Sequence, residues 1–379
     1  MRFNEIIGQR EVKTKLINTV KSNRISHAQL FLGPEGSGSL ALAIAYSQYI
    51  CCENRTETDS CGICRSCIKF QKLIHPDLHF SFPFVSKDKN DHSNTYITNW
   101  RSEILADPYL TLERWLTNWE GENKQPNLNA KECSEIQAKL SLTSFESEYK
   151  ILIMWLPEYL MEVGNSLLKL IEEPPEKTLL IFVASDHDKI LKTILSRTQL
   201  VKIPKIAESD LSKYLHQNTD LDAEHLSSVL MLSNGNYNEA MNFANNKENK
   251  YQSEFINWMR LCFRQDIPAI VEWSEGMAKN TREVNKSFFR YSLKMIEEAV
   301  VYSFKPESNI ISPITDFLKK FSPFIHLQNS GKLRKELDEA HYHMERNANP
   351  KILFLAVSLK LTYLLKADKN CEQNILLTE

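Results

Sequence analysis

The sequence predicts an α/β domain built on a parallel sheet and followed by an all-helical C-terminal part. Short apolar runs at 151–155 and 179–183 alternate with segments of helical period in the first 205 residues, and such alternation is typical of parallel sheets. A glycine-rich segment at 33–40 stands between an apolar run and a helical pattern, the order of a nucleotide-binding βα unit. After 201–204, every periodic segment repeats at three and four residues.

The elements follow in order along the chain. We expect helices over 10–26, after the glycine-rich segment, and over 164–173 and 190–195, with strands at 30–32, 151–155, 179–183 and 200–203. Residues 79–128 are polar with scattered aromatic residues, and we expect them to form a surface insertion that is partly mobile. Phe289 and Ile296 lie on one face of a later helix. Asn349 and Pro350 should open an apolar final helix that is buried on several sides.

The composition is that of an ordinary globular protein with two or three domains. Apolar residues make up 42% and charged residues 25% of the 379 residues, and the formal net charge is -2. A nearly neutral chain gains little non-specific affinity for phosphates, so DNA contacts should come from a local patch or from a complex. No apolar run is long enough for a membrane span and no leader is apparent, so we expect a cytoplasmic protein.

The glycine-rich segment has the glycine spacing of a phosphate-binding loop, G-x-x-x-x-G-K-[ST]. Its cofactor-binding positions are Gly33, Gly36, Gly38 and Ser39. A working loop uses Lys to reach the phosphates and Ser or Thr to hold Mg²⁺, but here Ser39 and Leu40 occupy those two positions. Backbone amides alone could still cradle an anion. We therefore predict no ATP hydrolysis at this loop.

The run at 151–155 should be the second nucleotide-handling strand, which normally ends in acidic groups for Mg²⁺ and for water activation. It leads instead into Trp155, and the first carboxylate, Glu158, comes three residues later. This second loss agrees with the first.

Four cysteines, Cys52, Cys61, Cys64 and Cys67, have the spacing C-x8-C-x2-C-x2-C. Four thiolates this close together are typical of one tetrahedral, structural Zn²⁺ without a free coordination position. The alternative is four unrelated reduced cysteines. Spacing cannot separate Cys52 from Cys51, and His75 and His79 are further ligand candidates, although His75-Pro76-Asp77 favours a turn.

Arg197 lies between the predicted helix at 190–195 and the strand at 200–203, next to Ser196. A lone arginine is usually a solvated surface charge. Its alternative role is a finger in trans, because a planar, permanently charged guanidinium can stabilise the transferring phosphoryl group of a neighbour's ATP.

Together these segments resemble the bacterial DNA polymerase III clamp-loader subunits of the AAA+ family, over nearly the whole chain. Besides the cysteines, the matching segments are 7–9 (IGQ), 24–34 (RISHAQLFLGP), 75–77 (HPD), 165–175 (NSLLKLIEEPP), 196–198 (SRT), 235–240 (GNYNEA) and 347–350 (NANP). The family's active gamma/tau motors keep the loop lysine, whereas delta-prime subunits tolerate its loss. The chain resembles delta-prime in this, and Asn238 stands where the family's lid arginine would be.

The resemblance implies three domains: an AAA+ domain over 1–205 with a zinc module (52–67) and the insertion (79–128), a helical lid (206–248), and a helical collar (249–379). It implies a non-hydrolysing delta-prime stator of the DNA polymerase III holoenzyme, with gamma/tau and delta as partners. The complex would load the β sliding clamp onto primed DNA, and Arg197 would be the trans-acting finger.

Two alternatives stay open. One is an active gamma/tau-like ATPase. The other is a zinc module that binds nucleic acid by itself, for which Arg65, Lys69 and Lys72 supply a modest basic surface.

Overall fold

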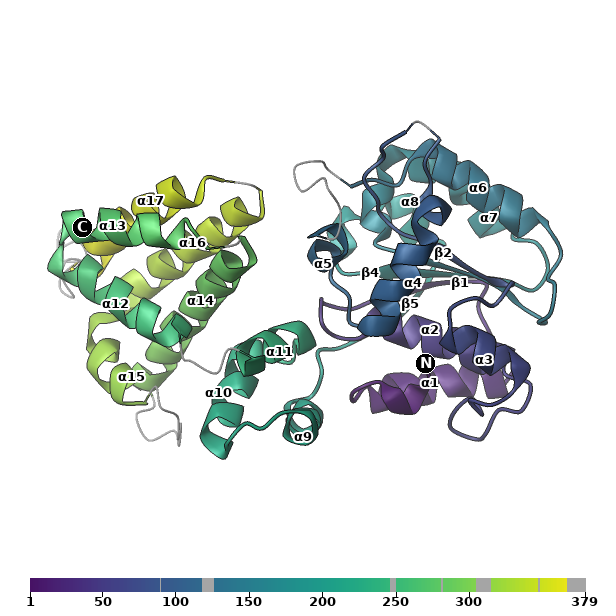
Figure 1. Ribbon diagram of the computed structural model, residues 1–379, viewed down its shortest axis with the longest axis horizontal. Coiled ribbons are helices and arrows are strands. Elements are labelled where there is room, and N and C mark those ends of the chain that lie inside the picture. Colours follow the sequence, from purple (N-terminus) through teal and green to yellow (C-terminus); the bar gives the residue numbers. More distant parts are fainter. Residues whose placement is uncertain are drawn as a thin grey trace, which may run out of the picture. The chain divides into compact units, whose positions relative to one another are not determined.

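The computed structural model describes residues 1–88, 90–117, 126–245, 250–280, 282–304, 315–346 and 348–366. The chain divides into two compact units (Figure 1), one of Met1–Asn218 with Ser233–Ala240 and one of Thr219–Leu232 with Met241–Glu379. The predicted boundary between lid and collar, at 248, lies outside the described residues, and the division into three domains stays a prediction. None of the described helices combines the length and apolar character that crossing a bilayer requires.

The first unit contains a five-stranded sheet in the order β2-β3-β4-β1-β5, with all neighbours parallel. The strands are β1 (Ala28–Leu32), β2 (Leu78–Ser81), β3 (Lys150–Trp155), β4 (Thr178–Ala184) and β5 (Gln199–Lys202). The central strand β4 pairs with β1 on one side, where Leu30 faces Phe182, and with β3 on the other, where Ile153 faces Ile181. The predicted parallel α/β sheet is confirmed.

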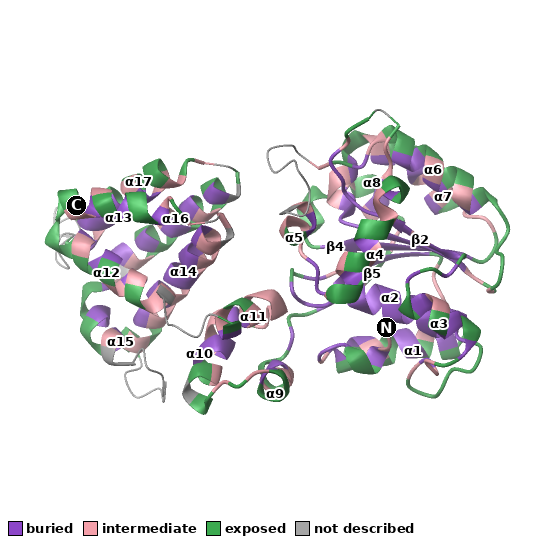
Figure 2. Ribbon diagram, viewed as in Figure 1, coloured by how far each residue is buried: buried purple, intermediate pink, exposed green. Residues whose placement is uncertain are grey.

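Each central strand buries both of its faces, because helices cover the two sides of the sheet. Along β3, Ile151 and Ile153 join one core with α1 (Arg10–Lys21), α2 (Ser39–Cys51) and α4 (Ile97–Ala106). Leu152 and Met154 join a second core with α6 (Ala130–Ser141) and η3 (Pro157–Leu167). This explains why the sequence of these strands is a continuous apolar run rather than an alternating one. Figure 2 shows the buried strands between the helices, with α2 buried along its whole length.

The helices of the first unit lie before, between and after these strands along the chain. They are η1 (Phe3–Glu5), α1 (Arg10–Lys21), α2 (Ser39–Cys51), α3 (Arg65–Gln71), η2 (Ser93–Tyr96), α4 (Ile97–Ala106), α5 (Leu112–Thr117), α6 (Ala130–Ser141), η3 (Pro157–Leu167), α7 (Leu168–Glu172), η4 (His187–Lys189), α8 (Lys192–Leu195) and α9 (Glu208–Asn218). The helix predicted over 164–173 is therefore a 3-10 segment up to Leu167, and only its end, α7, is α-helical.

The segment 79–128 differs from the expected surface insertion. Its first residues belong to β2, the edge strand that pairs with β3. Three of its aromatic residues form a core cluster: the ring centroids of Phe82 and Trp100 lie 4.1 Å apart, and Trp115 packs edge-on against both. All three side chains are fully buried. The prediction of a surface segment is wrong for this cluster, because large aromatic side chains favour burial even within a polar stretch.

The C-terminal part is helical, as predicted. Its elements are α10 (Ala223–Ser233), α11 (Tyr237–Asn245), α12 (Lys250–Arg264), α13 (Ile267–Met277), α14 (Arg282–Phe304), α15 (Thr315–Phe321), η5 (Ser322–Phe324), α16 (Leu327–Glu345) and α17 (Pro350–Leu364). In α14, Phe289 and Ile296 are buried on one face. The Asn349 side chain caps α17 by accepting a hydrogen bond from the Ile352 N–H, and Pro350 occupies the first turn, as expected.

The final helix is less buried than its sequence predicts. Phe354 and Leu361 are buried, but Ile352, Leu359 and Tyr363 are 67%, 45% and 76% exposed. These three residues are seven and four positions apart, so they share one face of α17. The apolar sequence of this helix thus supplies a buried face and, beside it, an exposed apolar face (Figure 2).

Candidate functional site

The glycine loop lies between β1 and α2, where a phosphate-binding loop would be. Gly36 and Gly38 have φ of 74° and 85°, the left-handed conformation that glycine adopts at little cost. Neither distinguishing side chain of a working loop is present: the Ser39 hydroxyl bonds the Ser37 hydroxyl at 2.9 Å, and Leu40 is buried in the core. The loop has kept its backbone form without groups for the phosphates or the metal.

Residues distant in sequence pack against this loop. Gln9 donates from Nε2 to the Ser37 carbonyl at 3.0 Å, and the Tyr237 N–H donates to the Gly36 carbonyl at 3.2 Å. A Cβ placed on Gly36 would lie 1.9 Å from Asn236 Oδ1, and one placed on Gly38 would lie 2.9 Å from the ring of Tyr109. Sequence reasoning missed Tyr109, because its contacts join segments about a hundred residues apart.

The carboxyl end of β3 has a packing role. Trp155 is buried, with its ring centroid 5.0 Å from that of Trp100. Glu158 accepts hydrogen bonds from the N–H groups of Ser185 and Asp186, at 2.7 and 2.9 Å, in the turn after β4. Burial raises the pKa of Glu158. The first carboxylate after this strand in the sequence is therefore engaged in holding a neighbouring turn.

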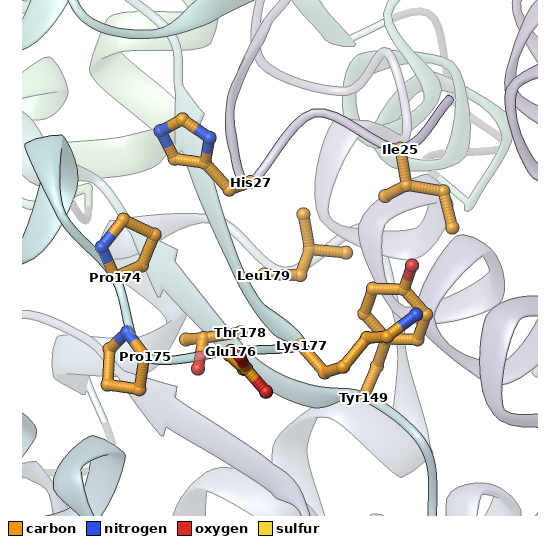
Figure 3. Close-up of a pocket in the computed structure, with 9 residues that line it drawn as sticks. All are labelled: Ile25, His27, Tyr149, Pro174, Pro175, Glu176, Lys177, Thr178 and Leu179. Carbon is orange, nitrogen blue, oxygen red and sulfur yellow. The ribbon is translucent and has the colours of Figure 1, made fainter. Parts of the chain in front are cut away.

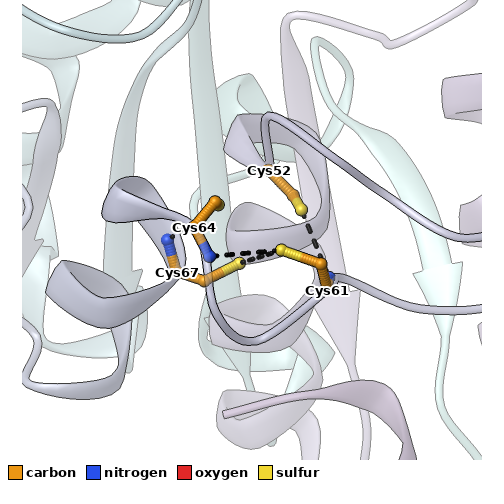
Figure 4. A group of neighbouring side chains, drawn as sticks. All are labelled: Cys52, Cys61, Cys64 and Cys67. Carbon is orange, nitrogen blue, oxygen red and sulfur yellow. Dashed lines mark hydrogen bonds between the residues drawn. The ribbon is translucent and has the colours of Figure 1, made fainter.

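The other end of α2 leads into the cysteine cluster. The four sulfur atoms of Cys52, Cys61, Cys64 and Cys67 all lie within 4.8 Å of one another (Figure 4), although 15 positions separate the first from the last. Backbone N–H groups donate to three of them: Cys61 to Cys52 Sγ at 3.3 Å, Cys64 to Cys61 Sγ at 3.3 Å, and Cys67 to Cys64 Sγ at 3.4 Å. Such bonds stabilise thiolates and fix the direction of each sulfur.

This arrangement fits a tetrahedral zinc ion. A Zn–S bond of about 2.3 Å places sulfur atoms about 3.8 Å apart in a tetrahedron, and Cys61 Sγ and Cys67 Sγ are 3.9 Å apart. The donor set is all sulfur, which Zn²⁺ accepts as a closed structural site. The geometry therefore permits the predicted ion at these four residues.

The other candidate ligands point elsewhere. The Cys51 thiol faces the Ser147 hydroxyl at 3.6 Å, and burial raises its pKa to about 12. Within the part of the chain that the structure describes, the converging ligand group includes neither His75 nor His79. His75 begins the predicted turn: its carbonyl accepts a hydrogen bond from the Leu78 N–H, and its ring packs at a tilt of 36° against Phe70, with 4.7 Å between centroids.

The two residues of the predicted finger lie just after α8, close to the end of α7. Arg197 Nε pairs with Glu172 Oε1 at 2.5 Å, and its Nη1 donates to the Thr193 carbonyl at 3.0 Å and to the Ser196 hydroxyl at 3.2 Å. Its side chain is 35% exposed. The guanidinium is thus oriented at the surface by the segment that contains the EEPP sequence.

Two other predicted positions complete the site residues. Asn238 donates from Nδ2 to the Tyr109 carbonyl at 2.9 Å, so this side chain is engaged in a contact within the protein. Asn347 lies outside the described residues. Of the basic residues near the cysteines, Lys69 is paired with Glu146, so the modest basic surface expected there is partly neutralised.

A surface pocket of about 250 Å³ lies at the opposite end of the strands from the glycine loop (Figure 3). His27 and Thr178, at the amino ends of β1 and β4, contribute to its lining, and His27 Nε2 lies 3.1 Å from the Ile171 carbonyl. Glu176 and Lys177 bring opposite charges to the same lining. The pocket therefore presents neither a carboxylate cluster for a metal nor a cationic cluster for phosphate.

Comparison with known proteins places this geometry in a family. The family described as "DNA polymerase III, delta subunit" matches residues 8–207, more than half of the chain. The chain is 27% identical to DNA polymerase III subunit delta' of Bacillus subtilis, over 65% of this chain and 61% of that protein. It is 26% identical to subunit gamma/tau of Mycobacterium tuberculosis, over 52% of this chain and only 27% of that protein.

Solved structures with similar chains include a gamma subunit-related protein of Thermotoga maritima. That alignment has 13% identity and a TM-score of 0.39, and covers 92% of this chain and 99% of the other. A point mutant of RuvB from the same organism aligns with 11% identity and a TM-score of 0.35, over 78% of each chain. These scores are low, and the fold is defined by the sheet order itself.

Proposed function

We propose a function from the premise that this chain belongs to the DNA polymerase III delta-subunit family, within the clamp-loader AAA+ proteins. The chain acts as a non-hydrolysing subunit of the delta-prime type. It is a stator in a loader that places the β sliding clamp on primed DNA, with gamma/tau motors and delta as its partners.

One observation carries this proposal: the chain lacks the groups that hydrolyse ATP in its own loop, yet presents an oriented arginine at its surface. Phosphoryl transfer requires a cation at the phosphates and a liganded Mg²⁺. Ser39 and Leu40 cannot supply them, and Glu158 is engaged with the turn after β4. A subunit with these losses can contribute to ATP hydrolysis only at a neighbour's site.

Arg197 is the residue suited to that contribution. Glu172 and Thr193 hold its guanidinium from one side, and the planar group has further N–H donors for phosphate oxygens. A guanidinium supplied in trans stabilises charge that develops on the transferring phosphoryl group. Arg197 with Ser196 therefore forms the proposed finger toward a neighbouring motor subunit.

The exposed face of α17 supports assembly with other subunits. Ile352, Leu359 and Tyr363 form a contiguous apolar stripe at helical spacing, and such stripes mark contact surfaces when they are not covered. In the proposal this face packs against the corresponding helix of a neighbouring subunit.

The proposed metal is one structural Zn²⁺ held by Cys52, Cys61, Cys64 and Cys67. With four sulfur ligands it offers no position for water or substrate, so it would stabilise the module and take no part in chemistry.

The test is the steady-state ATPase rate of a reconstituted loader, stimulated by clamp and primed DNA. We expect Arg197→Ala to lower this rate roughly tenfold or more, since a finger contributes on the order of 10³–10⁵ at the single site it serves. Arg197→Lys keeps the positive charge but loses the planar guanidinium with its paired N–H donors, so it should restore little of the ATPase rate. Lys192→Ala, an exposed cation on α8, is the matched control and should leave the rate unchanged.

Gel filtration must first show that each variant assembles into the loader. The isolated chain should show no turnover. If the isolated chain hydrolyses ATP, it is an active gamma/tau-like ATPase, a function to which its similarity to gamma/tau proteins also points. If an assembled Arg197→Ala loader hydrolyses ATP at the wild-type rate, Arg197 is not a trans-acting finger.

A further inference from the structure

Tyr109 occupies a position above the glycine loop, in the short turn between α4 and α5. Its ring is buried, and contacts three segments that are far apart in the sequence. The hydroxyl oxygen accepts a hydrogen bond from the Ile7 N–H at 2.9 Å. The ring stacks on Tyr237 with centroids 4.2 Å apart and an interplanar angle of 29°, and its edge lies against Gly38.

These contacts are the kind a purine base would make. A purine is a flat aromatic ring with hydrogen-bond acceptors on its edge, and proteins bind such rings by stacking and by backbone N–H donors. Here the flat ring belongs to tyrosine, the stacking partner is Tyr237, and the acceptor is the phenol oxygen that takes the Ile7 N–H. The base position lies beside a loop that once would have held phosphates at the start of α2.

The turn is anchored at both ends, so the ring is held in place. The Tyr109 carbonyl accepts from Asn238 Nδ2 at 2.9 Å, and the Tyr109 N–H donates to Asp107 Oδ1 at 2.9 Å. Arg114 pairs with the same Asp107 carboxylate at 2.7 Å. Because the backbone of Tyr109 is already fixed, holding its ring in place costs little conformational entropy. The ring can therefore remain in this position permanently.

The loop side of the space is closed as well. Tyr237 donates its N–H to the Gly36 carbonyl, and Asn236 Oδ1 touches the place where a Gly36 side chain would begin. The loop, Ile7 and the start of α11 are therefore joined directly by contacts of the protein's own groups.

We propose that Tyr109 is an internal occupant of the loop's base position, a built-in substitute that keeps purine nucleotides out and holds the surrounding segments together. The ligand class that it displaces is a purine nucleoside diphosphate or triphosphate. This proposal rests on the proposed function in one respect, because it takes the glycine loop to be a former nucleotide-binding site.

The experiment is calorimetric titration of the isolated full chain with ADP and Mg²⁺. Wild type should show no saturable binding up to about 1 mM, on the order of the weakest specific affinities. Tyr109→Ala removes the ring and should bind ADP at least about tenfold more tightly than wild type. Tyr109→Phe keeps the ring and loses only the phenol oxygen, so it should still exclude ADP.

A second measurement, the melting temperature, is needed in case removal of the Tyr109 ring destabilises the fold. Adenosine should raise the melting temperature of Tyr109→Ala, or of the milder Tyr109→Leu, and leave that of wild type unchanged. Equal ADP binding by wild type and Tyr109→Ala would overturn the proposal, as would a folded alanine variant that neither binds ADP nor responds to adenosine.

Failure of this proposal and failure of the proposed function give different results. If the wild-type chain binds ADP but does not hydrolyse ATP, Tyr109 is not an internal occupant of the base position, and the proposed stator function is unaffected. Turnover by the isolated wild-type chain contradicts the stator, whichever variant binds.

Discussion

The two ends of α2 differ in what surrounds them: one end leads into a group of converging metal-ligand side chains, and the other begins at a glycine loop covered by protein side chains. At its C-terminal end, four sulfur atoms converge with backbone N–H donors behind them, and their spacing matches the bonds of a metal ion. At its N-terminal end, the protein's own side chains, Asn236 and Tyr109, pack against Gly36 and Gly38 of the loop, and we have proposed that Tyr109 takes the place of a ligand. In that proposal, the difference teaches that a binding loop can keep its backbone form while a side chain of the protein takes the place of its ligand.

The largest effect should come from the cysteine end. Cys52→Ser removes a ligand and should reduce zinc from about one equivalent per chain to below half, since structural zinc contributes on the order of 10 kcal/mol to folding of such modules. Cys51→Ser is the matched control, because that thiol faces Ser147, outside the cluster. Metal analysis with thermal unfolding distinguishes them. Equal zinc loss in both variants would contradict the assignment of Cys52.

The next effect concerns the loop end. Gly36→Ala forces a side chain into left-handed backbone and against Asn236, and we expect a loss of roughly 2–5 kcal/mol in the free energy of unfolding. Gly276→Ala is the control, since nothing lies within 4 Å of its Cβ position in α13, and it should gain up to about 1 kcal/mol. Urea unfolding measures both. A tolerated Gly36→Ala would indicate an open loop.

The smallest expected effect is a pH dependence of the free energy of unfolding, which arises from a residue outside both ends of α2. Burial first, and then Lys139, lower the pKa of His79 on β2 to about 4 from 6.5. Neutral His79 therefore stabilises the fold fully above pH 6.5, and this contribution, at most about 3 kcal/mol, is lost as pH falls through 4. His79→Gln should flatten the stability profile between pH 6.5 and 4, as followed by urea unfolding at fixed zinc. An unchanged profile would mean that His79 remains solvated.

Local patterns carried most of what the sequence could predict. The strands β1, β3 and β4 were recognisable because both of their faces are buried, which makes each a continuous apolar run. The cysteines needed only their spacing, and Asn349 with Pro350 marked the start of α17. The edge strand β2 was missed because Leu78, His79, Phe80 and Ser81 form too short a pattern to stand out before a polar stretch.

Contacts between distant segments were beyond the sequence. Nothing near Tyr109 indicates that its hydroxyl meets Ile7, 102 positions earlier, and nothing near Trp100 shows that it packs on Trp155. The exposed face of α17 was hidden for another reason, because an apolar side chain has the same sequence signal whether its partner is the same chain or another one.

In our proposal, Glu158 makes the loss of ATP hydrolysis hard to reverse. Its carboxylate fastens the turn after β4 to the start of η3, so the first acidic group after β3 in the sequence is part of the scaffold. Restoring a lysine and a threonine to the glycine loop would recreate the motif in the sequence but leave the magnesium without its acidic partner and the base position without a vacancy. Under this proposal, a chain changed at only these two residues would still not hydrolyse ATP, because the side chains packed around the loop would have to change as well.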